Sequence, residues 1–195
     1  MFETVKRIFS RLKGNKDVSF SAAPGEVPIH NFTDYQSYLA AGTGKVWASF
    51  KACDLTGTTV QETPWSLKNE AGDKVENKLI EDLLIAPNAN MTWREILYLT
   101  VIHFKLTGNS FWYKSEANQN GDRPTELIPL NPKNMKIIPS KSGGVAGYVY
   151  RLPSGTVPFD FDEIMHFKRP HPDNEFWGMG DIEGAEKVFQ DHINR

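Results

Sequence analysis

The hydrophobic pattern of residues 92–106 predicts the strongest helix of the chain, because apolar side chains recur there at intervals of three and four. Thr92 and Glu95 have the spacing of a capping box, in which a hydroxyl and a carboxylate satisfy the first free backbone amides. The apolar side chains cover most of the circumference, so we expect this helix to lie centrally in the core. Gly108 is expected to end the helix in a left-handed conformation.

Strand patterns follow this helix. Phe111, Trp112 and Tyr113 predict a strand in which the first and third side chains share one face and Trp112 takes the other. A turn is expected at residues 118–122, and Pro and Gly residues separate the later strands. These strands are expected at Glu126–Leu130, Met135–Pro139, Tyr148–Leu152 and Asp162–Phe167.

Shorter helical patterns occur elsewhere in the chain. They cover residues 2–13, 33–41, 46–60, 79–84 and 180–195, and residues 64–67 are expected to form a short strand. The first of these helices is amphipathic, and we expect it to dock on this protein or on a neighbouring subunit rather than on a membrane. The last pattern reaches residue 195 without a stop signal, which favours a chain cut inside a longer protein.

These elements predict an α+β fold of helices packed on short antiparallel strands, truncated in a C-terminal helix. Residues 1–44 are expected to form the amphipathic helix and an extended arm, and residues 45–195 a core that is incomplete at its C-terminus. The predicted buried side chains are Trp47, Phe50, Leu84, Trp93, Leu97, Val101, Phe104, Phe111, Tyr113, Ile164 and Val188.

Composition narrows the possible functions. The 195 residues are 39% hydrophobic and 24% charged, which is typical of a folded globular chain. The net charge of −2 gives no general support for nucleic-acid binding, although a local patch would not show in the total. Cys53 is the single cysteine, which excludes an internal disulfide and a multi-cysteine zinc site. We identify neither a signal peptide nor a run of transmembrane length.

Three histidines are the candidates for catalysis or metal binding, but their spacing matches no metal-binding motif. His103 lies in the apolar helix, where a hydrogen-bonded core histidine is expected. His166 is expected to bond a backbone group and anchor the loop that leads to Gly178. We therefore expect no catalytic residue, metal or cofactor. A metal-dependent hydrolase or nuclease that uses His166 and His171 remains the alternative.

A small basic cluster is the second candidate site. Lys168 and Arg169 lie next to aromatic residues, including Trp177, and basic side chains interleaved with aromatics can contact single-stranded nucleic acid. The predicted contacts are with nucleic acid or with a protein interface, so a nucleic-acid-binding module is a further alternative. The competing interpretation is a solvated loop whose aromatic side chains are buried in the core.

The order of short motifs along residues 45–195 resembles the portal proteins of tailed bacteriophages, the head–tail connector family. Each motif alone is weak, and their shared order and spacing carry the resemblance. The motifs are Trp47–Asp54, Pro64–Lys68, Leu83–Asn88, Thr92–Glu95, Leu106–Asn109, Leu127–Pro132, Tyr148–Tyr150, Glu163–His166 and Trp177–Ile182. The family usually starts the last helix with a Gly-x-Ser-Pro-like segment, and this chain has Gly178–Ile182 there instead.

The resemblance implies a structural subunit of the portal ring, from its wing-like region. Such a ring is dodecameric, lies at the capsid vertex of the virion and conducts double-stranded DNA during packaging and ejection. The implied partners are the terminase large subunit, the capsid and head–tail adaptor proteins, with assembly in the bacterial host cytoplasm and no membrane contact. ATP hydrolysis would belong to the terminase. The residues expected to have structural roles are Pro87, Asn88, Gly108, Asn109, Pro129, Pro132, His166 and Gly178.

Overall fold

The computed structural model describes residues 47–116 and 124–181. The helix predicted at 180–195 is described only at Gly180 and Asp181, where the backbone is not helical. The helices predicted at 2–13 and 33–41, the turn at 118–122 and the buried position of Val188 lie outside the described residues. So do the side chains of Trp47 and Phe50, although their backbone belongs to the first described helix.

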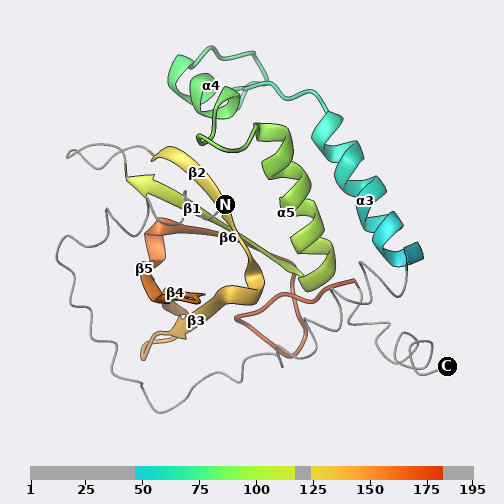
Figure 1. The fold of residues 1–195 in the computed structure, drawn as a ribbon. Helices are drawn as coiled ribbons and strands as arrows, with labels where there is room; N and C mark the ends of the chain where they lie inside the picture. Colours follow the sequence, from blue (N-terminus) through green and yellow to red (C-terminus); the bar gives the residue numbers. More distant parts are fainter. Residues whose placement is uncertain (1–46, 117–123, 182–195) are drawn as a thin grey trace.

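The described chain is a run of helices followed by a run of strands (Figure 1). The helices are α3 (Trp47–Glu62), α4 (Lys78–Ile85) and α5 (Trp93–Thr107). The strands are β1 (Asn109–Glu116), β2 (Pro124–Leu130), β3 (Met135–Pro139), β4 (Val145–Leu152), β5 (Gly155–Asp160) and β6 (Ile164–Lys168). Short 3-10 turns η2 (Pro132–Asn134) and η3 (Phe161–Glu163) join β2 to β3 and β5 to β6. The predicted α+β class is confirmed.

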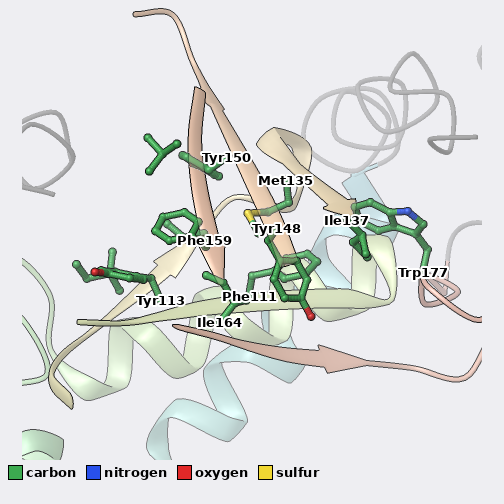
Figure 2. Packing of buried hydrophobic residues seen from close by; sticks show 12 residues of the cluster. Phe111, Tyr113, Met135, Ile137, Tyr148, Tyr150, Phe159, Ile164 and Trp177 are labelled. Atoms are coloured by element: carbon green, nitrogen blue, oxygen red, sulfur yellow. The ribbon is translucent and has the colours of Figure 1, made fainter. Parts of the chain in front are cut away.

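Two antiparallel sheets stack against each other. One has the strand order β2-β1-β6 and the other β3-β4-β5. The main core fills the space between them, and Figure 2 shows its side chains converging from both sheets and from the loop that carries Trp177. Phe111 and Met135 are completely buried in this core.

The helices form the outer layers of the molecule. α5 packs on the other face of the β2-β1-β6 sheet, where Ile96 contacts Trp112 and Leu127. α3 lies along α5 and covers its far side (Figure 1). The Tyr98 hydroxyl of α5 donates a 2.8 Å hydrogen bond to a carboxylate oxygen of Asp54, which fixes the register of the two helices.

The predicted limits of α5 are confirmed. The Thr92 hydroxyl accepts from the Glu95 amide, and the Glu95 carboxylate accepts from the Thr92 amide at 2.7 Å, so the capping box is complete. At the other end Gly108 has a φ of 70° and its amide donates to the Phe104 carbonyl. The predicted placement of the β1 side chains on two faces is also confirmed. Phe111 and Tyr113 face the core between the sheets, and Trp112 faces α5.

Three predictions of secondary structure were wrong. Residues 64–67 do not form a strand. The β-type pairing next to them is an isolated bridge between Lys68 and Lys74. Strand β5 was missed because Pro158 and Gly155 argue locally against a strand, whereas an edge position tolerates both. The last strand begins at Ile164, because residues 161–163 form the 3-10 turn η3.

The predicted core was correct for Leu97, Phe111, Tyr113 and Ile164, all of which are buried. Four other predicted core residues are half-buried instead: Leu84, Trp93, Val101 and Phe104. An apolar helix packed between one neighbouring helix and one sheet leaves the sides of its circumference incompletely covered. Within the described residues, the helices are too short or too polar to cross a membrane.

Candidate functional site

The corner between α5 and β1 is the position at which four of the eight predicted structural residues meet. Gly108 ends the helix there, and its left-handed backbone turns the chain directly into β1. A side chain at this position would overlap the backbone of Gly178 and Met179, which cross the end of the helix. The residue is therefore required to be glycine both for its conformation and for the close approach of the crossing loop.

The crossing segment, residues 177–181, lies directly on the helix end. An added Cβ at Gly178 would overlap the Gly108 carbonyl oxygen, and one at Gly180 would overlap the Leu106 carbonyl oxygen. The Asp181 amide donates to the Lys105 carbonyl at 2.9 Å, which satisfies one of the helix's terminal acceptors. Backbone thus packs on backbone, and this loop and the last turn of α5 behave as one unit.

Asn109 holds the loop in place with its side-chain amide. Its Oδ1 accepts a 2.8 Å hydrogen bond from the Gly178 amide, and its Nδ2 donates to the Gly178 carbonyl at 3.2 Å. Nδ2 also donates to the Thr107 carbonyl. Because Oδ1 accepts from a backbone amide while Nδ2 donates to two carbonyls, the orientation of the amide group is fixed.

His166 approaches the same amide from β6. Its Nε2 lies 3.0 Å from Asn109 Oδ1, an oxygen that can accept and cannot donate, so Nε2 carries the proton. The ring stacks on Phe111, with centroids 4.2 Å apart. Burial, helped by the nearby Lys168 charge, lowers the pKa of His166 to about 4, so the imidazole is neutral at neutral pH.

The bond of His166 predicted to a backbone group is made instead to the side chain of Asn109, and it is Asn109 that bonds the Gly178 backbone. That His166 anchors the loop stays a prediction.

The basic residues of the cluster are engaged in interactions within the chain. Arg169 pairs with Asp181, which also forms a 2.8 Å ion pair with Lys105. The Lys168 ammonium group donates to the Glu175 carbonyl. Trp177 is 7% exposed and packs edge-to-face on Phe111, with centroids 6.0 Å apart. The predicted nucleic-acid or interface contact does not fit Trp177, whose ring is part of the core.

The four other predicted structural residues surround β2. Pro87 is buried and its carbonyl accepts from the Leu127 amide at 2.7 Å, while the Asn88 Nδ2 donates to the Leu127 carbonyl at 2.8 Å. Together they cover the outer edge of β2. Residue 129 has the same orientation as Leu127, so the missing N–H of Pro129 faces this outer side and costs no bond with β1. Pro132 is buried at the start of η2.

The other two histidines of the described residues, His103 and His171, do not form a catalytic group with the corner. His171 Nδ1 accepts from the Asp173 amide at 3.0 Å. His103 is half-buried, and burial lowers its pKa to about 4. Its Nδ1 is inaccessible to solvent and has no hydrogen-bond partner among the described residues, contrary to the expected hydrogen-bonded histidine. Within residues 47–116 and 124–181, no three His, Cys, Asp or Glu residues are grouped as a metal site requires.

Sequence reasoning missed Lys105, Thr107, Gly180 and Asp181 as members of this corner. Thr107 joins it through its hydroxyl, which donates to the His103 carbonyl and accepts from the Asn109 amide. The available signal was the Gly-Met-Gly-Asp segment after Trp177, since two glycines two residues apart suit a backbone that lies flat on another. That signal indicates a close approach and does not say to which element.

Comparison with known proteins gives one family. The family model described as phage portal protein matches residues 48–194 of the chain. An uncharacterized protein of Rickettsia bellii (strain RML369-C) is 24% identical over 150 residues, which are 73% of this chain and 38% of that protein.

Solved structures share the fold. The neck of an empty gene transfer agent (GTA) particle, computed with C6 symmetry, matches with a TM-score of 0.73 and 22% identity over 94% of this chain and 47% of that chain. The neck of a native GTA particle, computed with C12 symmetry, matches with a TM-score of 0.69 and 22% identity over 80% of this chain and 41% of the other. The chain thus spans less than half the length of these similar proteins.

Proposed function

The chain belongs to the phage portal protein family, and we propose that it acts as a structural subunit of a portal ring at the capsid vertex. In this role copies of the chain close a ring that conducts double-stranded DNA during packaging and ejection. The ring also docks the terminase, the capsid and the head–tail adaptor proteins. The family match over residues 48–194 is the observation that carries the proposal.

The architecture supports a mechanical role. Interlocked layers bury apolar side chains on both faces of the β2-β1-β6 sheet, and the corner at Gly108 couples the helices to the strands through backbone contacts. The polar side chains at this corner bond one another or the backbone. Such an arrangement transmits force between elements without a large conformational change. We accordingly propose no bond-breaking chemistry for this chain.

The symmetry of the similar particles supports a ring of twelve. Two of the structures that share this fold are particle necks computed with C6 and C12 symmetry. A closed ring needs two different, complementary surfaces on each subunit, because its contacts are head-to-tail. We propose a dodecamer in the virion, assembled in the bacterial host cytoplasm, with residues 1–44 as an arm and residues 45–195 as the wing-like core.

Electron microscopy of the longest gene product that contains this chain tests the proposal, together with a mass measurement in solution. Closed rings with twelve-fold symmetry and an axial channel support it. A protein that stays monomeric at micromolar concentration and forms no rings contradicts it. A parallel assay for metal-stimulated DNA cleavage tests the alternative enzyme, which requires hydrolysis that disappears in a His171→Ala variant.

A further inference from the structure

The outer edge of β6 is the least protected sheet edge in the described part of the molecule. β6 is the last strand of the β2-β1-β6 sheet, and it pairs with β1 on one side. The Arg169 amide, which immediately follows β6, donates to the Gly108 carbonyl and so points toward β1. Backbone groups alternate along a strand, so those of Ile164, His166 and Lys168 point away from β1.

Each of the three other sheet edges carries a feature that discourages pairing with another strand. β2 contains Pro129, and its outer edge is covered by Pro87 and Asn88. β3 carries Lys136 and ends in an irregular step at its terminal proline. β5 contains Pro158 at its centre. Proline, lysine and bulges are the usual protection of an exposed edge.

β6 lacks such protection along most of its length. The strand Ile164–Lys168 contains no proline, follows β1 without a bulge, and has one lysine, at its last position. Its neighbourhood also exposes apolar side chains, since Met165 is 36% exposed and Phe161 at the preceding turn is 59% exposed. An unprotected edge beside exposed apolar groups is the signature of a site for strand addition.

One segment of the chain outside the described residues has the pattern of a strand that fits this edge. Val18, Phe20 and Ala22 alternate with Ser19 and Ser21, which gives one apolar and one polar face. The run contains no proline and is as long as β6. The connection through residues 23–46 spans up to about 80 Å when extended, so it reaches β6 from the start of α3.

We propose that residues 18–22 add to the outer edge of β6 as a fourth strand of the β2-β1-β6 sheet. The added backbone bonds the free N–H and C=O groups of β6, and its apolar face covers Met165. The strand comes from the same copy, because the connection through residues 23–46 is long enough to reach β6 from the start of α3. The inference rests on the sheet edge and not on ring formation.

Disulfide trapping tests the pairing in the full chain. Met165→Cys is combined in turn with Ser19→Cys, Phe20→Cys and Ser21→Cys, while the native Cys53 stays in place because it is buried. Mild oxidation is expected to cross-link at least one of these pairs within one copy, as seen by mass spectrometry of the monomer band, and cross-links found only between copies contradict the proposal. The matched control is Thr156→Cys on the edge of β5, which is exposed and is expected to give no cross-link with the same partners. Absence of any cross-link to position 165, or equal cross-linking to position 156, overturns the proposal.

Amide hydrogen exchange gives a second test that requires no cysteine. Pairing protects the amides of Ile164, His166 and Lys168, which are otherwise open to solvent. A double variant, Ser19→Pro and Ser21→Pro, removes two donors from the added strand and is expected to speed exchange at these amides by about tenfold or more. Glu26→Pro, outside the segment, is expected to leave the rates unchanged. Equal exchange rates in the natural chain and the double variant contradict strand addition.

Discussion

A single amide side chain joins three elements of this protein. Asn109 begins β1, bonds the backbone of Gly178 through both its donor and its acceptor, and accepts from His166 on β6. An aspartate would lose the donor, and an alanine would leave the Gly178 amide buried without a partner. The polar network thus explains why an asparagine is needed at the point where the helix becomes a strand.

We predict that Asn109→Ala lowers the free energy of unfolding by about 2–4 kcal/mol, because several buried hydrogen bonds are lost together. Chemical denaturation of the variant and the natural chain gives the difference. Asn69→Ala is the matched control, since Asn69 makes similar bonds to Asp73 in an exposed turn. A cost at Asn109 no larger than the cost at Asn69 would show that the network is unimportant for stability.

Two half-buried histidines, His103 and His166, predict a loss of stability in acid. Folding lowers the pKa of His166 to about 4, from an ordinary value of 6.5, through burial and the nearby Lys168. The unfolded chain therefore binds the proton first, so stability is full above pH 6.5 and decreases as the pH falls toward 4. The decrease is about 3 kcal/mol for this group, and His103 adds to it because burial lowers its pKa to about 4 as well.

Denaturation measured at several pH values between 7 and 4 checks this prediction. His166→Gln keeps a side-chain donor for Asn109 but does not titrate, so its stability is expected to depend on pH about half as steeply as that of the natural chain. An identical pH dependence in the two proteins would mean that His166 titrates normally in the folded state.

The residues of this network were predictable one by one, but their connection was not. Gly108 and Asn109 follow from the local pattern, since a helix that runs into a strand needs a left-handed residue and a side chain that bonds the turn. The partner loop lies 69 positions further along the chain. Its contact with the corner depends on how the sheet folds back, which short-range patterns do not encode.

At the level of elements, burial depends on what lies on each side of a helix or strand. Phe104 is apolar and lies in the central helix, yet it is half-buried, whereas Phe111 on β1 is completely buried between the two sheets. We predict that Phe111→Ala costs about 3–5 kcal/mol because it leaves a cavity in the main core. Thermal and chemical denaturation measure the cost.

Phe161→Ala is the control for this substitution, because Phe161 is 59% exposed and is expected to lose less than about 1 kcal/mol. The main core would have to be placed elsewhere if the two alanine variants were equally stable.

The crossing of the loop over α5 gives a prediction about backbone packing. Gly178→Ala places a methyl group on the Gly108 carbonyl, and the overlapping atoms belong to the backbone rather than to a flexible side chain. We expect a loss of more than about 3 kcal/mol, or failure to fold. Gly72→Ala tests conformation without crowding, since Gly72 has a φ of 89° and open space around it, and should cost about 1–2 kcal/mol. Circular dichroism and denaturation of both variants distinguish the two effects.

Elements with strong local end signals were predicted well, and elements that depend on their neighbours were not. The capping box and Gly108 defined α5, because each acts within one turn of the helix. Strand β5 contains a central Pro158, which is permitted because the strand lies at a sheet edge. Edge and centre are properties of the assembled sheet, so a local pattern cannot distinguish them.

At the level of the whole molecule, several apolar side chains remain exposed, and the proposed ring would place its subunit contacts on them. On the helical side, Leu55 of α3 is 69% exposed and Ile85 of α4 is 76% exposed. At the turn between the last two strands, Phe161 is 59% exposed. Leu55 and Ile85 lie on helices, whereas Phe161 lies in the turn between β5 and β6, and a head-to-tail ring contact needs two different surfaces on each subunit.

We predict that Ile85→Ser weakens ring formation without weakening the fold. The side chain is already in contact with water, so the free energy of unfolding should change by less than about 0.5 kcal/mol. A contact repeated at every subunit boundary multiplies a small local loss, and the fraction of rings should fall by about tenfold or more at the same protein concentration. Lys78→Ser on the same helix is the control and should assemble normally. Unchanged assembly of the Ile85 variant would place the subunit contact on another surface of the stack.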